Sequence, residues 1–200
     1  RNCRAHGIGA RVDLMSAATG LVADPRPREA ATMLPVYGQL PFVPDSAYGC
    51  DILTTDGRRI LDLYGGHAGA ALGYNHPALT EAVSKQASRR LFQSNAVALD
   101  VRASAAEKLT TVAPGWLNHV FFVNSGAEAN ENALRMACVV TGRRIVLAIS
   151  KSFQGRTAAA AAVNWYSAGW YGFPERPFDV DFIPRDDCDA AKAMIDSDVA

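Results

Sequence analysis

Residues 121–131 read FFVNSGAEANE, and this stretch decides the fold because a short apolar run leads directly into a helix start. The run at 119–123 is rich in β-forming residues, which is typical of a strand covered on both faces. Ser125, followed three residues later by Glu128, forms a capping box: the serine oxygen accepts from the Glu128 amide, and the carboxylate reaches back to the Ser125 amide. The stretch therefore predicts a buried strand followed by a helix that begins at Gly126.

The residues after Gly126 have the period of an amphipathic helix. Its apolar positions fall at i, i+3, i+4 and i+7 and are Ala133, Met136, Ala137 and Val140. Gly142 is a typical C-terminal stop, and a second apolar run occupies 145–149. The order strand, helix, strand favours a right-handed parallel crossover.

Two features of this unit indicate a bound anion. The first turn of a helix carries unpaired amides and a positive dipole end, and Gly126 and Ala127 have almost no side chain to keep a phosphate away. The loop after the second strand reads SKSFQGRT, residues 150–157, and opens at the same edge of a parallel sheet. It sets an aromatic ring, an amide and an arginine beside the anion site, which suits a phosphorylated planar cofactor. The alternative is that Ser125 only caps a helix.

The chain resembles a known family at these residues. The matching motifs are NSGAEANE at 124–131 with ALRMA at 133–137, and SFQGRT at 152–157. They are similar to those of the class III aminotransferases, fold type I enzymes that depend on pyridoxal phosphate (PLP). The nearest group is the acetylornithine, ornithine and LysW-lysine aminotransferases, and the resemblance runs from about Leu34 to the end of the chain. It implies an α/β fold, a three-layer α/β/α large domain present in part, preceded by a segment with a β-hairpin.

The resemblance assigns the cofactor site residue by residue. It implies that Ser125, Gly126 and Ala127 hold the cofactor phosphate and that Phe153 stacks on the pyridine ring, an offset aromatic contact that is physically reasonable. Gln154 stands where many relatives have histidine and others have tryptophan, so its role at the cofactor is open.

The resemblance also implies two substrate-binding side chains. Arg156 matches an arginine that grips a substrate carboxylate in several members, which a guanidinium does through two parallel hydrogen bonds. Its alternative is an ordinary surface ion pair. His67, in the glycine-rich run 65–69, falls where relatives present a substrate-contacting side chain, and its alternative is a structural histidine.

No catalytic residue is assigned within the chain. The resemblance implies a lysine that forms the Schiff base with PLP and an acidic partner of the pyridine nitrogen, both expected beyond Ala200. The chain's own lysines, which are Lys85, Lys108, Lys151 and Lys192, do not lie in the motif expected around the catalytic one. We therefore interpret the chain as the N-terminal half of a longer enzyme and expect it to be inactive alone.

Three segments are predicted along the chain. Residues 1–31 are interpreted as a mobile or loosely attached arm, in which Met15 could be the natural start and 1–14 an upstream addition. Residues 32–94 hold a hairpin at Asp56-Gly57 and a helix at 78–91.

Residues 95–200 form the first part of the large domain. They include a helix at 100–112, a strand at 180–183 and a helix at 188–195. The alanine-rich run 158–163 is either a helix start or a packed turn, and the aromatic segment 165–178 is interpreted as a loop near the mouth of the site or at a subunit interface.

Composition excludes several function classes. The 200 residues carry 20 basic and 20 acidic side chains with 49% hydrophobic content, which gives no support to nucleic-acid or membrane binding. The cysteines have no metal-ligand or disulfide spacing and are Cys3, Cys50, Cys138 and Cys188. We expect no metal site and a cytoplasmic setting.

The resemblance implies that the whole enzyme moves an amino group from an ornithine-, acetylornithine- or lysine-like donor to 2-oxoglutarate, as a homodimer. Two alternatives stay open. Other class III members shift an amine within one molecule or decarboxylate a dialkyl amino acid. The chain is also interpretable as a non-catalytic fragment that binds a phosphate ligand or a partner chain.

Overall fold

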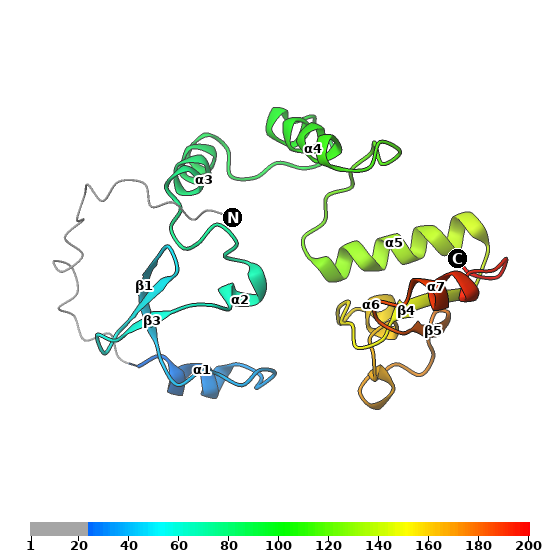
Figure 1. Cartoon of the computed structure of the whole chain (residues 1–200). Helices are drawn as coiled ribbons and strands as arrows, with labels where there is room; N and C mark the ends of the chain where they lie inside the picture. The colour runs from blue at the N-terminus through cyan, green and yellow to red at the C-terminus, as the bar shows by residue number, and fades with distance from the viewer. Residues whose placement is uncertain (1–23) are drawn as a thin grey trace. The chain divides into compact units, whose positions relative to one another are not determined.

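A computed structural model of the chain describes residues 24–200 (Figure 1). The expectations for residues 1–23, including the Met15 start, lie outside the described residues. The described residues divide into two compact units, 24–97 and 98–200, and each is described by itself. The predicted segment boundary at 94 lies close to this division.

The first described element is helix α1, Arg26–Thr32, which lies at the end of the predicted arm. Pro25 stands at its N-cap and the Arg28 and Glu29 amides both donate to the Pro25 carbonyl at 3.0 Å. The composition of the arm did not indicate this helix. Proline before a helix is a recognised start signal, because its missing N–H would be unpaired there in any case.

The predicted hairpin is confirmed and belongs to a three-stranded antiparallel sheet. Strands β1 (Pro44–Tyr48), β2 (Asp51–Thr54) and β3 (Arg59–Leu61) lie in the order β1-β2-β3. Gly57 takes a positive φ of 81° in the turn between β2 and β3, which is the conformation that glycine adopts without steric cost.

Asp56 stabilises this turn from its own side chain. Arg58 Nε donates to the Asp56 carboxylate at 2.9 Å, and the Thr54 hydroxyl donates to its other oxygen. These contacts, with the Arg58 hydrogen bond as the largest cause, lower the pKa of Asp56 from 3.8 to about 2.

We expect a pH dependence of the turn from this shift. Because the folded pKa lies below the unfolded one, the contribution of Asp56 is fully present above about pH 4 and is lost as pH falls through about 2. An NMR titration of the Asp56 carboxyl should show this midpoint, and Arg58→Ala should raise it toward 3.8. The same midpoint in both proteins would contradict the assignment.

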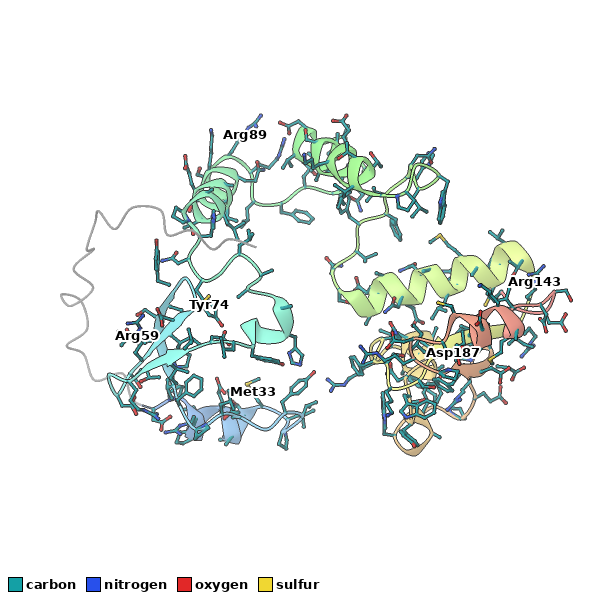
Figure 2. The ribbon with its side chains drawn as sticks, in the orientation of Figure 1. Met33, Arg59, Tyr74, Arg89, Arg143 and Asp187 are labelled. Atoms are coloured by element: carbon teal, nitrogen blue, oxygen red, sulfur yellow. The ribbon has the colours of Figure 1, made fainter. Side chains whose placement is uncertain are left out.

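A left-handed turn follows the sheet. The segment labelled α2, Gly65–Ala68, has four consecutive residues at positive φ, from 57° to 64°. Asp62 holds its entrance: the carboxylate accepts from the Tyr64 and Gly65 amides at 2.8 and 2.9 Å and from the Tyr74 hydroxyl at 2.5 Å, with Tyr74 visible in Figure 2. The Tyr74 hydrogen bond is the largest cause of the lowered pKa of Asp62.

Two helices lie in the chain between this left-handed turn and α5 (Gly126–Thr141). Helix α3, Pro77–Arg89, has Pro77 at its first position as predicted and ends two residues before the expected limit of 91. Helix α4, Asp100–Val112, has the predicted bounds and belongs to the second unit.

The second unit is built on a parallel pair of strands. Strands β4 (Ile145–Ile149) and β5 (Asp179–Ile183) pair in parallel, and Val199 adds a parallel bridge to Ile145. Arg143 donates to the Val199 carbonyl at 2.7 Å (Figure 2). The predictions of both strands are confirmed within one residue.

Short helices join and cover these strands. Between β4 and β5 lie α6 (Ala158–Ala162) and the 3-10 turn η1 (Ser167–Gly169), and α7 (Cys188–Met194) follows β5. The core contains Val146, Ala148, Ala159, Ala162, Val163 and Phe178. The alanine-rich run is thus both a helix and part of the core.

The predicted strand at 119–123 is wrong. This segment has no regular structure, and Phe121 is 65% exposed. Within residues 24–200 this segment pairs with no strand of either sheet, and an unpaired extended segment has no ladder of hydrogen bonds. The predicted crossover through α5 is therefore wrong as well, and the parallel crossover is the β4–β5 connection that contains α6.

Helix α5, Gly126–Thr141, has the predicted start and ends at Gly142 in the left-handed conformation. Its packed face differs from the predicted one. Leu134 and Cys138 contact the core, whereas Met136 and Val140 of the predicted apolar face are exposed. The helix has two apolar faces, and the spacing of its apolar residues alone did not indicate which face packs on the core.

Candidate functional site

The start of α5 leaves backbone amides available. Ser125 Oγ accepts from the Glu128 amide at 3.1 Å, as predicted. The Glu128 carboxylate accepts from the Asn124 amide at 2.7 Å rather than from that of Ser125, because it reaches one residue further back along the chain. In the part of the chain that the structure describes, the amides of Gly126 and Ala127 have no acceptor.

These free amides fit a phosphate. A Cβ built on Gly126 meets no atom within 4 Å, so the space in front of the first turn is open. Amides and the dipole of a sixteen-residue helix both favour an anion there. The chemistry of the donors thus suits the phosphate group that the sequence predicts.

The loop after β4 lies directly on this helix start. A Cβ built on Gly155 would lie 2.5 Å from Ala127 Cβ and 3.1 Å from Ala160 Cβ, and Gly155 has a φ of 141°. Only glycine fits such a close approach with that backbone conformation. The loop and the helix start therefore meet, as the sequence analysis expects.

Side-chain amides hold the middle of the loop. Asn130 Nδ2, on the second turn of α5, donates to the Gln154 carbonyl at 2.8 Å and to its side-chain oxygen at 3.1 Å. The Gln154 amide donates to Asn164 Oδ1, and Asn164 Nδ2 donates to the Gly155 carbonyl at 2.6 Å. The side chain of Gln154 is thus engaged with α5.

Glu131 joins α5 to the start of α6. Its Oε2 accepts from the Thr157 hydroxyl at 2.6 Å and from the Ala159 and Ala160 amides at 2.8 and 3.0 Å. Helix α6 has no side-chain cap of its own, so Glu131 takes the role of a cap from a distant part of the sequence. The sequence analysis missed Glu131 and Asn164, although an alanine run without a capping residue is a signal that a cap comes from elsewhere.

Phe153 and Arg156 line an open pocket of about 580 Å³. The guanidinium carbon of Arg156 lies 5.8 Å from the centre of the Phe153 ring, and Phe153 is 64% exposed. The pocket is lined by Lys151, Ser152, Phe153, Arg156, Asn164, Trp165 and Trp170. Its aromatic walls and two cations suit a planar ligand that carries an anionic group.

His67 belongs to the other unit. It lies on the left-handed turn at a φ of 58°, and its ring packs edge-on against Tyr64 with 4.9 Å between the ring centres. The ring is exposed. The structure describes it separately from the loop that carries Arg156.

Residues 24–200 form neither a metal-binding cluster nor a membrane-spanning helix. These residues contain no group of three or more histidine, cysteine, aspartate or glutamate side chains placed to hold a metal ion. None of the helices formed by these residues has both the length and the apolar composition needed to cross a membrane.

Residues 33–197 match the family described as aminotransferase class-III. The chain is 36% identical over 187 residues to the acetylornithine aminotransferase of Mycobacterium tuberculosis (strain ATCC 25618 / H37Rv), which covers 93% of this chain and 46% of that protein. It is 34% identical over 145 residues to a putative [LysW]-aminoadipate semialdehyde/glutamate semialdehyde transaminase of Aeropyrum pernix, with 72% and 37% covered. The chain thus spans about half the length, or less, of these relatives.

Solved structures share the fold. An ornithine aminotransferase from Toxoplasma gondii superimposes with a TM-score of 0.74 at 22% identity, covering 88% of this chain and 43% of that one. A taurine:2-oxoglutarate aminotransferase from Bifidobacterium kashiwanohense, solved in complex with PLP and glutamate, gives 0.70 at 27% identity, covering 78% and 36%. The predicted fold class, part of a fold type I large domain, is confirmed.

Proposed function

Because this chain belongs to the class III aminotransferases, we propose that the complete protein is a PLP-dependent aminotransferase. One observation carries the proposal: the helix start that bears the unpaired amides of Gly126 and Ala127 meets, at Ala127, the loop that bears Phe153 and Arg156. The amides of the helix start can donate hydrogen bonds to the phosphate of a planar cofactor. The aromatic ring and the arginine of the adjacent loop can contact the cofactor ring and a substrate carboxylate.

Each residue of the site has a proposed part. Ser125, Gly126 and Ala127 hold the phosphate of the cofactor, and the ring of Phe153 covers one face of its pyridine. Bound PLP supplies the electron sink and carries the amino group between two substrates. Gln154 holds the loop through Asn130, which supports a positioning role for this residue.

Arg156 is proposed to bind the substrate carboxylate. Its guanidinium lines the pocket next to Phe153, so a carboxylate held there lies close to the ring position. The name of the Mycobacterium tuberculosis relative supports a donor of the acetylornithine type, and ornithine-like and lysine-like donors stay predictions. The acceptor 2-oxoglutarate, a substrate contact by His67, homodimeric assembly and a cytoplasmic setting stay predictions.

Amine transfer by the complete protein tests this function. The protein is incubated with PLP and 2-oxoglutarate, and glutamate formation is measured with ornithine, acetylornithine and lysine as donors. Glutamate formed with at least one donor, together with a PLP absorption band, is the expected result. A PLP band without transfer to 2-oxoglutarate would favour another class III reaction, and no PLP binding would contradict the proposal.

Phe153→Ala should weaken cofactor retention. An aromatic contact contributes about 0.5–1.5 kcal/mol beyond its buried area, so the dissociation constant of PLP should rise by about tenfold. Fluorescence titration with PLP measures it. Phe173→Ala removes an exposed ring outside the pocket and should leave the constant unchanged, and an unchanged constant in Phe153→Ala would contradict ring stacking.

Arg156→Lys should weaken binding of a dicarboxylate. One ammonium does not reproduce the two parallel hydrogen bonds of a guanidinium, so the KM for 2-oxoglutarate should rise by about tenfold. Steady-state kinetics measure it. Arg176→Lys is the matched control, because Arg176 also lies over an aromatic ring, that of Tyr171 at 5.6 Å, but outside the pocket. A KM unaltered in Arg156→Lys would remove Arg156 from the substrate site.

A further inference from the structure

Asn164 is the most enclosed large polar side chain of the second unit. It follows α6 and is 1% exposed. Burying an amide side chain is unfavourable unless both its donor and its acceptor form hydrogen bonds. The two side-chain hydrogen bonds of Asn164 therefore indicate its structural role.

Both bonds of Asn164 go to the backbone of the loop. The Gln154 amide donates to Oδ1, and Nδ2 donates to the Gly155 carbonyl at 2.6 Å. The Gln154 carbonyl, which lies between these two groups in the chain, accepts from Asn130 Nδ2 at 2.8 Å. The peptide groups of two successive residues are therefore held by side chains from two different elements.

Phe153 and Arg156 flank the two residues, Gln154 and Gly155, whose peptide groups are hydrogen-bonded in this way. Phe153 precedes Gln154 and Arg156 follows Gly155, and both line the pocket that Asn164 also lines. Gly155 also lies so close to Ala127 that a Cβ on it would be 2.5 Å from Ala127 Cβ. A shift of Gln154 and Gly155 would therefore move the Phe153 ring and the Arg156 guanidinium together.

We propose that Asn164 is a positioning residue that sets Phe153 and Arg156 in one fixed arrangement, so that cofactor binding and carboxylate binding depend on the same buried amide. This rests on the proposed function, because Phe153 and Arg156 are there assigned to the cofactor and the substrate. Asparagine is suited to the task, since one planar group offers the donor and the acceptor that two adjacent peptide groups require.

Two substitutions distinguish the contributions of the two Asn164 side-chain hydrogen bonds. Asn164→Ala removes both and leaves a buried amide and a buried carbonyl unpaired. Asn164→Asp keeps an acceptor for the Gln154 amide but loses the donor to Gly155 and sets a carboxylate oxygen against its carbonyl. Each change is expected to raise both the dissociation constant of PLP and the KM for the carboxylate substrate by about tenfold.

The joint change is the distinguishing result, measured on the complete protein. Phe153→Ala should alter chiefly the cofactor constant and Arg156→Lys chiefly the KM, whereas the Asn164 variants should alter both. Ser167→Ala is the control for loss of a buried polar group, because Ser167 is 2% exposed in the same unit and its hydroxyl bonds with the Ala162 carbonyl and with Arg176 instead of with the loop. It should alter neither constant. An Asn164 variant that changes only one constant, or neither, would overturn the proposal.

Hydrogen exchange gives a readout that is independent of activity. In the wild-type protein the Gln154 amide should exchange at least about tenfold more slowly than that of Phe153, which has no acceptor among the described residues. Equal rates would overturn the proposal even if no Asn164 variant folds. Slow exchange at Gln154 in a protein that neither binds PLP nor transfers an amine would instead show that the proposed function is wrong while the loop is held as inferred.

Discussion

Gly155→Ala is expected to detach the loop from α5 and to abolish measurable PLP binding. The added methyl group would lie 2.5 Å from Ala127 Cβ and 2.9 Å from Ala127 Cα, and the latter is backbone that moves only with the helix. Alanine also avoids a φ of 141°. Overpacking and backbone strain each cost about 1–3 kcal/mol, so the free energy of unfolding of the second unit should fall by about 2–6 kcal/mol.

A glycine in the same unit provides the control. Gly172 has a φ of 77°, but a Cβ there meets only the Trp170 carbonyl oxygen, at 3.8 Å. Gly172→Ala therefore introduces strain without a clash and should lose only about 1–3 kcal/mol, with PLP binding kept. Chemical denaturation and PLP titration of both variants measure the difference. Equal losses in both would show that the contact between Gly155 and Ala127 is not what requires glycine.

Glu131→Ala is expected to be the second most damaging change. It leaves one hydroxyl and two amides at the start of α6 without the single oxygen that accepts from all three. Unpaired partly buried donors cost about 1–3 kcal/mol each, and water reaching the half-buried site reduces the sum, so we expect a loss of about 3 kcal/mol. Thermal unfolding of the second unit measures it.

Glu131→Gln tests the cause of that loss. Glutamine keeps one acceptor oxygen but no charge, so about half of the stability should return, since hydrogen bonds to charged groups are roughly twice as strong. Glu107→Ala removes an exposed carboxylate from α4 in the same unit and should change stability by less than about 0.5 kcal/mol. A Glu131→Ala protein as stable as Glu107→Ala would contradict the capping role.

The sequence predicted the elements whose causes are local. The capping box placed the start of α5, Gly142 its end, and Asp56-Gly57 the hairpin, because each signal acts within a few residues. The strand expected at 119–123 failed for the opposite reason. A strand requires a neighbour, and its own residues do not say whether one is present.

The candidate site likewise has features that the sequence predicted and features that it did not. The proposed anion site at the start of α5 and the aromatic and cationic side chains of the loop follow from the sequence motifs and the residue types. The buried hydrogen bonds that hold the loop do not, because Asn164 and Glu131 act on backbone groups nine or more residues away. An asparagine after an alanine run carries no pattern that distinguishes it from a turn residue.

The second apolar face of α5 bears on how the polypeptide behaves in solution. Met136, Val139 and Val140 are 53%, 76% and 84% exposed, although the face that bears Leu134 and Cys138 packs on the core. The chain carries no net charge and has an isoelectric point near 7.1, so electrostatic repulsion between copies is weakest at neutral pH. Any form that leaves this face bare will therefore be prone to aggregate near physiological pH and to engage chaperones, and its colloidal stability should improve on either side of neutrality.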